Sequence, residues 1–420
     1  MRSFLQLPIA WRRISAVALF LLGATTAYAQ QPTAAEENDK IKQLLQRIEQ
    51  LESRVKELET RQAPAAAATE AQRTSTEAEK PLAAAHGAMH DSTSSSSSPA
   101  LQIHGFSDVG YHVSDQKGET NSFGLGQIDL FISSRLSDQF SVLGELVLEA
   151  NEKNEFGFEA ERLLIQYSQS DYFNLSIGRY HTSIGYYNTA FHHGTWFQTA
   201  TGRPFIFAFE DEGGILPIHN VGLSATGRIP SGKLGLHYVA EIGNGRSRRT
   251  PIGEPVQNTV DENNGKAFNL GVFVRPDWLP GFQAGFSVYR DRLTPDGLPK
   301  IEETIAAAHF IYQGPSVEWL NEGVLVRHAP FGAGRAFNTG SFYTQISRKF
   351  GKWRPYFRYQ YVNVPEGDQI IGDAGRQNGP SAGLRFDATE FAAFKVQYDR
   401  SARRMLDSIN GLTLQVAFTF

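Results

Sequence analysis

The last ten residues, Gly411-Leu412-Thr413-Leu414-Gln415-Val416-Ala417-Phe418-Thr419-Phe420, decide the fold class. Large apolar residues occupy every second position from Leu412 to Phe420, and small or polar residues lie between them. Successive side chains of a β-strand point to opposite faces, so this stretch is typical of a strand with one apolar face. Strands of a membrane barrel have this pattern, with apolar side chains toward lipid and the others toward the interior. The alternative is an edge strand of a soluble sandwich, which rarely ends a chain on an exposed Phe.

The same alternation recurs upstream and predicts an all-β membrane protein, a 16-stranded antiparallel transmembrane β-barrel over residues 101–420. The expected strands cover 101–113, 122–135, 140–150, 155–167, 172–180, 219–229, 233–243, 267–275, 281–292, 303–313, 316–328, 339–349, 353–364, 381–388, 392–402 and 411–420. Connections after even-numbered strands are short, whereas most connections after odd-numbered strands are longer, above all 181–218 and 244–266. Such asymmetry and an even strand count are typical of outer-membrane barrels. A barrel of this size has an aqueous interior, because its side chains cannot fill it.

Composition excludes several kinds of chemistry. The 420 residues include 40 basic and 44 acidic ones, and this balance argues against nucleic acid as the main partner. The absence of Cys excludes disulfide frameworks, thiolate metal sites and cysteine nucleophiles. The motifs H-E-x-x-H and G-x-x-x-x-G-K-[ST] are also absent from the sequence. We therefore expect no enzyme and no cofactor.

Residues 1–29 predict a secretory signal peptide. Arginines precede an apolar stretch at 14–23, which is too short to cross a bilayer as a helix, and Ala27-Tyr28-Ala29 forms a small-residue cleavage site. No later segment has the apolar length of a transmembrane helix. An exported chain of this kind can span a membrane only as a closed barrel.

Residues 36–61 predict a coiled coil. Apolar residues recur from Ile41 to Leu58 in alternating steps of three and four, the seam of a coiled coil. The β-branched and Leu positions by themselves favour two strands, but the flanking Arg and Glu resemble the Arg-apolar-x-x-apolar-Glu signature of short trimeric coiled coils. The expected trimerisation residues are Arg47, Ile48, Leu51, Glu52, Arg54, Val55, Leu58 and Glu59. A single amphipathic helix is the alternative.

Residues 62–99 predict a flexible linker, because Ala and Ser dominate and almost nothing apolar is available for burial. His86 and His90 have a spacing that could hold a metal on a helix, but in such a tract they are expected to be solvated.

As a pattern, residues 101–420 resemble a sixteen-stranded trimeric bacterial porin. In that family the loop after strand 5 folds into the barrel and sets the constriction, and the resemblance implies this role for about 181–218. The run Gly178-Arg179-Tyr180-His181-Thr182-Ser183-Ile184-Gly185 is also similar to the strand-to-loop junction of the phosphate-selective (O/P) porins, without carrying their phosphate specificity. The terminal Phe420 resembles the C-terminal signal of outer-membrane barrels, which implies the barrel-assembly machinery as a partner.

The candidate pore residues are of two kinds. Glu210, Asp211 and Glu212, followed by two glycines, are loosely similar to the acidic stretch of a porin constriction loop. Carboxylates in a narrow channel favour cations and orient dipolar solutes; a solvated loop tip is the alternative. Strand parity also places charged side chains on the interior wall, namely Arg354, Arg358, Arg385, Lys395, Asp129 and Glu145. The basic ones could face the acidic loop, although Arg354 could instead meet lipid head groups.

Aromatic and histidine residues from Tyr186 to Trp196 would pack the loop against the barrel wall. Because adjacent side chains such as those of His192 and His193 usually point apart, no metal site is expected there.

The leading functional hypothesis is a passive, trimeric diffusion channel for small hydrophilic solutes and ions. It would lie in the outer membrane of a Gram-negative-type bacterium, with the coiled coil in the periplasm. The alternative is a structural tether, in which the barrel anchors a coil that reaches toward peptidoglycan. A third hypothesis, a barrel enzyme such as a lipase, lacks a convincing Ser and His pair.

Overall fold

The computed structural model describes residues 100–150, 155–192, 194–209, 213–246, 261–332, 334–404 and 406–420. The expected signal peptide, coiled coil and linker lie outside these residues, as do all eight expected trimerisation residues. The expected acidic stretch of Glu210, Asp211 and Glu212 also lies outside them.

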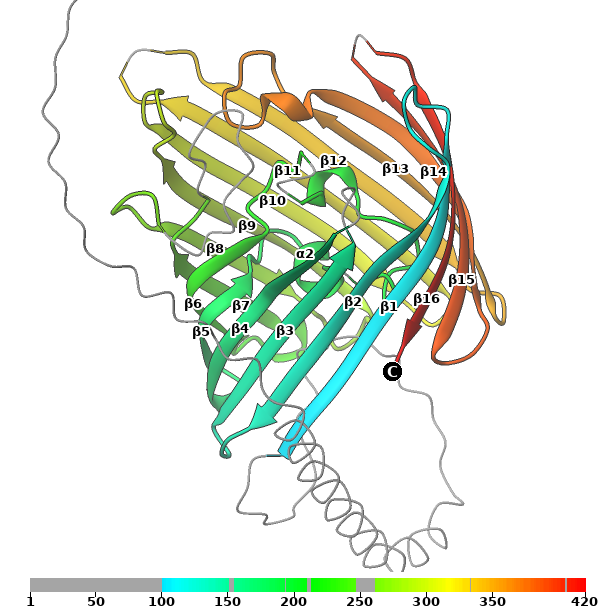
Figure 1. Ribbon diagram of the computed structural model, residues 1–420. Coiled ribbons are helices and arrows are strands. Elements are labelled where there is room, and N and C mark those ends of the chain that lie inside the picture. The colour runs from blue at the N-terminus through cyan, green and yellow to red at the C-terminus, as the bar shows by residue number, and fades with distance from the viewer. Residues whose placement is uncertain are drawn as a thin grey trace, which may run out of the picture. The chain divides into compact units, whose positions relative to one another are not determined.

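Sixteen antiparallel strands of the described residues form one closed barrel (Figure 1). The strands are β1 (Ala100–Ser114), β2 (Ser122–Arg135), β3 (Phe140–Ala150), β4 (Phe156–Ser170), β5 (Phe173–His181), β6 (His219–Ile229), β7 (Leu236–Gly243), β8 (Ala267–Val274), β9 (Phe282–Leu293), β10 (Ile301–Gln313), β11 (Val317–Pro330), β12 (Phe337–Arg348), β13 (Trp353–Asn363), β14 (Arg376–Asp387), β15 (Ala392–Arg403) and β16 (Ile409–Thr419). Each strand pairs with its sequence neighbours, and β1 closes on β16. The prediction of a sixteen-stranded antiparallel barrel is therefore confirmed.

Helices are few and short in the described part of the chain. They are α2 (Tyr187–Ala190) and the 3-10 turns η2 (Phe205–Phe207), η3 (Gly232–Leu234) and η4 (Gly372–Ala374). Among these residues no helix has the length and apolar character needed to cross a bilayer.

The terminal strand closes the barrel. Gly105 and Phe420 exchange two backbone hydrogen bonds of 2.9 Å, and the pairing continues from Phe106 opposite Thr419 to Ser114 opposite Gly411. A Cβ atom at position 105 would lie 2.7 Å from the Phe420 ring, so glycine permits this close approach. Closure leaves no unpaired sheet edge, which is a condition for a sheet in lipid.

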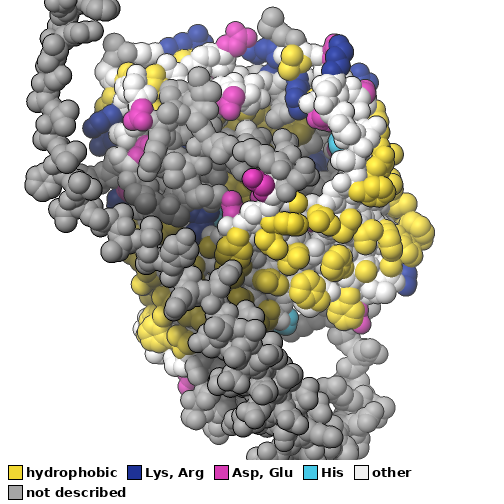
Figure 2. All heavy atoms as spheres, in the orientation of Figure 1, with side chains coloured by type: hydrophobic (Ala, Val, Ile, Leu, Met, Phe, Trp, Pro, Cys, Tyr) yellow, Lys and Arg dark blue, Asp and Glu magenta, His cyan; other side chains and the backbone are white. Residues whose placement is uncertain are grey.

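The two faces of the wall differ in chemistry, as the period-two pattern predicts. On β15, the side chain of Phe394 is 51% exposed whereas that of its neighbour Lys395 is 3% exposed. Figure 2 shows hydrophobic side chains gathered in a broad area on one face of the molecule, with charged side chains toward its upper rim. The apolar face is thus outside and most of the charged wall residues lie inside.

Most strand boundaries lie within one or two residues of expectation, and two strands begin three or more residues from the expected start. The strand β14 begins at Arg376 rather than at 381, although Asn378-Gly379-Pro380 has the composition of a turn. Pairing with β13 continues through this run, with Pro380 opposite Tyr359, so sheet contacts override the local preference. The strand β7 begins at Leu236 rather than at 233 because η3 occupies the intervening residues.

Candidate functional site

The described residues of the connection between β5 and β6, 182–192, 194–209 and 213–218, lie inside the barrel, and we term this connection the inner loop (Figure 1). Within this loop, the backbone N–H of Phe205 donates a hydrogen bond to Gln360 of β13 at 3.0 Å. The backbone N–H of Thr201 donates to Gln397 of β15, also at 3.0 Å. In a closed ring of sixteen strands, β13 lies on the wall opposite β5. The inner loop therefore crosses the interior, in the position that the porin resemblance implies.

One side of the inner loop is buried against the wall in an apolar core. Its residues Ile184, Ile206 and Phe207 pack in the same buried cluster as Ile305 of β10 and Leu320 of β11. Each large apolar side chain contributes about 1.5–3 kcal/mol on full burial. This part of the interior is filled by protein side chains.

One carboxylate of β11 holds the N-terminal part of the inner loop. Glu322 accepts hydrogen bonds from the backbone N–H of Tyr187 at 2.9 Å, from the N–H of Tyr186, and from the hydroxyl of Tyr343 at 2.8 Å. Burial raises the pKa of the Tyr187 hydroxyl, which stays neutral and donates to Gln198 within the loop. The start of α2 is thus fixed by a buried carboxylate that accepts three donors.

Cationic side chains of β13 to β15 hold the middle of the inner loop. These are four wall residues expected from strand parity, and their loop partners all lie within 195–202. Arg385 donates to the carbonyls of Trp196 and Gln198, Lys395 to those of Thr195 and Ala200, Arg358 to that of Gly202, and Arg354 to the hydroxyl of Thr199. Their positive charges are directed at loop backbone and hydroxyl oxygens rather than at open water.

The expected acidic wall residues Asp129 and Glu145 lie on β2 and β3 and are almost fully buried. Glu145 forms an ion pair with Arg162 of β4. Its carboxylate also interacts with that of Asp129. Both side chains are therefore buried within the wall, and neither lines the cavity described next.

A cavity of about 510 Å³ lies between the inner loop and strands β1 to β3. Its polar lining residues are Asp108, Gln127, Glu149, Thr195, Gln198, Arg203 and Gln377. Among the described residues, acidic side chains on the wall thus face Arg203 on the loop. The expected pairing of the basic wall residues with Glu210, Asp211 and Glu212 stays a prediction, because these three residues lie outside the described part of the chain.

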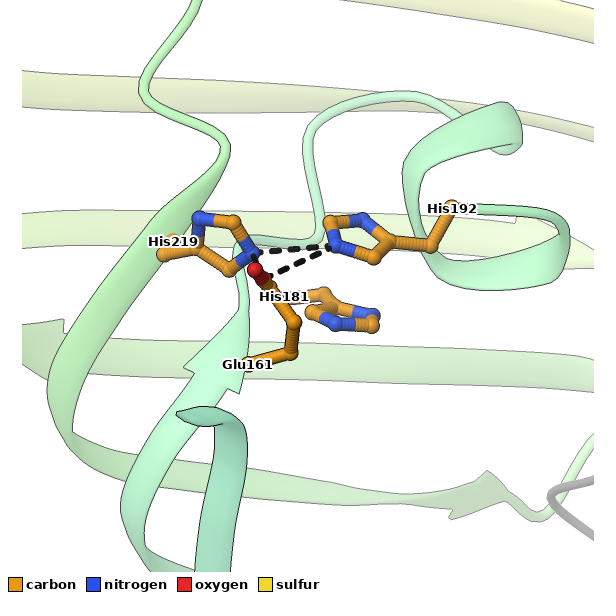
Figure 3. Close-up of side chains that lie close together, drawn as sticks. All are labelled: Glu161, His181, His192 and His219. Carbon is orange, nitrogen blue, oxygen red and sulfur yellow. Dashed lines mark hydrogen bonds and ion pairs between the residues drawn. The ribbon is translucent and has the colours of Figure 1, made fainter. Parts of the chain in front are cut away.

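Sequence reasoning missed a buried cluster of Glu161, His181, His192 and His219, which we term the His/Glu cluster (Figure 3). Glu161 lies on β4, His181 ends β5, His219 begins β6, and His192 follows α2. Each residue has one potential ligand atom within 4.8 Å of those of the others. The strand pairing contained a signal, because the residues that flank a loop between antiparallel neighbours lie face to face, and His181 pairs with His219.

Comparisons with known proteins give structural likeness alone. No family model and no curated protein matches the sequence. The anion-selective porin from Comamonas acidovorans is 11% identical, with a TM-score of 0.53 over 77% of this chain and 100% of its own. The outer-membrane channel DcaP of Acinetobacter baumannii is 10% identical, with a TM-score of 0.53 over 78% and 99%. Salmonella typhi OmpF, in complex with daunomycin, is 12% identical, with a TM-score of 0.51 over 76% and 97%.

Proposed function

Because the chain has the sixteen-stranded barrel fold of the outer-membrane porins, we propose that it is a passive diffusion channel for small hydrophilic solutes and ions. The observation that carries this proposal is the inner loop, which crosses the interior and leaves a polar cavity beside it. Passage through such a cavity changes no covalent bond, so the proposal includes no enzymatic activity. The membrane proposed is the outer membrane of a Gram-negative-type bacterium.

The charges beside the cavity support a field across the passage. Asp108 of β1 and Glu149 of β3 lie on the wall, and Arg203 lies on the loop. Opposed charges across a narrow channel orient dipolar solutes. They also change the passage rates of cations and anions by different amounts. We also propose that Glu210, Asp211 and Glu212 add negative potential to this passage.

The proposed oligomer is a homotrimer, with the coiled coil of residues 36–61 in the periplasm. Its support is the Arg and Glu pattern that flanks the apolar seam. The proposed assembly partner is the barrel-assembly machinery, since Phe420 ends the chain beside the closing strand β16. Peptidoglycan is a proposed partner of the coil.

The test is single-channel current from the purified full-length protein in a planar bilayer with a KCl gradient. We expect stable open levels that close in three equal steps, and a reversal potential that gives the charge preference. Silence from correctly folded, heat-modifiable protein would refute the channel. A different number of steps would refute the trimer alone.

A further inference from the structure

We propose that the His/Glu cluster is a binding site for a divalent transition-metal ion of the zinc class. The site goes beyond the proposed channel function, because it does not require that solutes pass through the barrel. Its four residues come from three strands and the inner loop, and all are buried, at 2% to 6% exposure. Buried groups of this kind are costly unless they are paired or coordinate a metal.

The central observation is that three electron-rich atoms converge. The Nε2 atoms of His192 and His219 lie 3.0 Å apart, and His192 Nε2 lies 3.3 Å from Glu161 Oε2. His219 Nε2 contacts the same carboxylate oxygen. Figure 3 shows these three side chains pointing toward one another. A cation between them would bind all three atoms at once.

The spacing fits a tetrahedral ion. Bonds of about 2.0–2.1 Å to nitrogen and oxygen place tetrahedral donors about 3.3 Å apart. Two of the three separations, 3.0 Å and 3.3 Å, are close to this value. The donors are two imidazoles and one carboxylate, a set that suits zinc and its neighbours rather than calcium or magnesium, which prefer oxygen ligands.

A second layer of contacts orients His192. Its Nδ1 lies 3.2 Å from Asn188 Oδ1. The amide of Asn188 cannot be reversed, because its Nδ2 donates to the carbonyls of Thr182 at 2.9 Å and Ile218 at 2.8 Å. His192 Nδ1 therefore carries the proton, and in the neutral ring the lone pair is on Nε2, toward the cluster. Metal-bound histidines commonly have an outer hydrogen bond of this kind.

His192 is also held in an unusual backbone conformation. Its φ is +41°, and it is the one non-glycine residue in the left-handed region among the described residues. The carbonyl of His192 accepts a hydrogen bond from Arg203 Nη1 at 2.7 Å. Such strained residues occur preferentially at ligand sites, and here the strain directs the ring to His219 and Glu161.

His181 supplies the fourth ligand after a rotation of its side chain. Its ring stacks on that of His192, with centroids 3.4 Å apart and planes inclined by 20°. Its buried Nε2 makes no hydrogen bond and lies 3.5 Å from Glu145 Oε2. The bound ion would join β4, β5 and β6 to the inner loop and so restrict movement of the loop.

The test is metal binding to the untagged full-length protein in detergent, with Zn²⁺ measured by calorimetry and Co²⁺ by its visible spectrum. The background variant is His86→Gln/His90→Gln, which removes the second His pair that could bind metal. We expect one Zn²⁺ per chain, the intense absorption of tetrahedral Co²⁺, and no competition from Ca²⁺ or Mg²⁺.

His192→Gln and the near-isosteric Glu161→Gln should each weaken Zn²⁺ binding. Loss of a residue that only hydrogen-bonds to a metal ligand weakens binding by roughly 10- to 100-fold, and we expect the loss of a ligand to exceed this. The matched control is His309→Gln, a buried histidine of β10 whose Nε2 lies 2.9 Å from a nitrogen of Gln283, outside the cluster. It should bind Zn²⁺ as the background does.

Two results would overturn the proposal. One is a background protein that binds no Zn²⁺ or gives no tetrahedral Co²⁺ spectrum. This result would refute the metal site even if the cluster variants fail to fold. The other is full binding in both cluster variants. Because binding is measured without current, a silent bilayer that refutes the channel would leave the metal site standing.

Discussion

At the scale of single residues, Gly185 decides whether the inner loop can be anchored. Its φ is +75°, and a Cβ atom there would lie 2.3 Å from the Glu322 carboxylate. That carboxylate binds the N–H groups at the start of α2. A side chain at position 185 would therefore strain the backbone and displace the anchor together.

We expect Gly185→Ala to lower the free energy of unfolding by about 1–3 kcal/mol and to increase open-channel current noise. Thermal unfolding in detergent and bilayer recording would measure the two effects. The matched control is Gly118→Ala on an exposed turn. Its φ is +92° and an added Cβ atom would meet nothing within 4 Å, so this substitution carries the backbone strain alone. Equal effects of both substitutions would contradict the anchoring role of Glu322.

Asp368, in the connection between β13 and β14, makes the stability of the folded protein depend on pH in the acidic range. Burial alone would raise the pKa of its carboxyl, but hydrogen bonds from His328 and the N–H groups of Ile370 and Ile371 outweigh burial and hold the pKa below its ordinary value of 3.8. A lowered pKa in the folded state stabilises the protein above pH 3.8, and this stabilisation is lost as the pH falls through the lowered value.

Asp368→Asn should therefore destabilise the barrel at pH 7, and the difference from wild type should shrink as the pH falls below 3.8. Unfolding temperatures between pH 7 and pH 3 would show this, with the exposed Asp296→Asn as control. A difference that is constant over this range would contradict the assigned role.

At the scale of elements, the cations of β14 and β15 fix the middle of the inner loop. Arg385 and Lys395 together donate to four carbonyls of residues 195–200. Hydrogen bonds to charged groups contribute about 1.5–3 kcal/mol each, which makes these two side chains the main polar attachment of the segment.

Arg385→Gln/Lys395→Gln should release this segment, raising single-channel conductance and current noise. Arg400→Gln, an exposed residue of the same β15, is the control. Conductance identical to wild type in the double variant would show that these two cations do not position the loop.

The strands could be predicted from the sequence, whereas the groups that their inward side chains bind inside the barrel could not. Strand positions and the inward direction of Arg385 and Lys395 follow from a period of two, a local property. What these side chains bind depends on the path of a loop 187 to 200 residues earlier in the chain. No local pattern encodes that path, so the sequence predicts the inward direction of these side chains but not the loop carbonyls that they bind.

The His/Glu cluster shows the same limit. Its members are separated by 11 to 58 positions, without the short regular spacing of a metal motif. His192 enters it through a positive φ that nothing in the neighbouring residues predicts. The pairing of His181 with His219 was within reach, since strand bounds alone place the two ends of the loop opposite each other.

At the scale of the whole molecule, ion preference depends on the sum of charges along the passage. The described part contributes acidic Asp108 and Glu149 against Arg203, and the sequence adds three carboxylates at 210–212. The excess is negative, so we expect a preference for cations.

Glu210→Gln/Asp211→Asn/Glu212→Gln should reduce that preference, seen as a reversal potential closer to zero in a KCl gradient. The triple substitution Asp296→Asn/Glu390→Gln/Asp407→Asn, of exposed acidic residues on other connections, controls for net charge. An unchanged reversal potential would remove the 210–212 stretch from the pore.

The attachment of the inner loop to β15 also has a consequence for the order of biogenesis. The inner loop follows β5 in the chain, yet Lys395, which donates to two of its carbonyls, belongs to β15. Until β15 is in place, Thr195 and Ala200 lack their contacts with Lys395. The final position of the middle of the inner loop therefore depends on a nearly complete barrel.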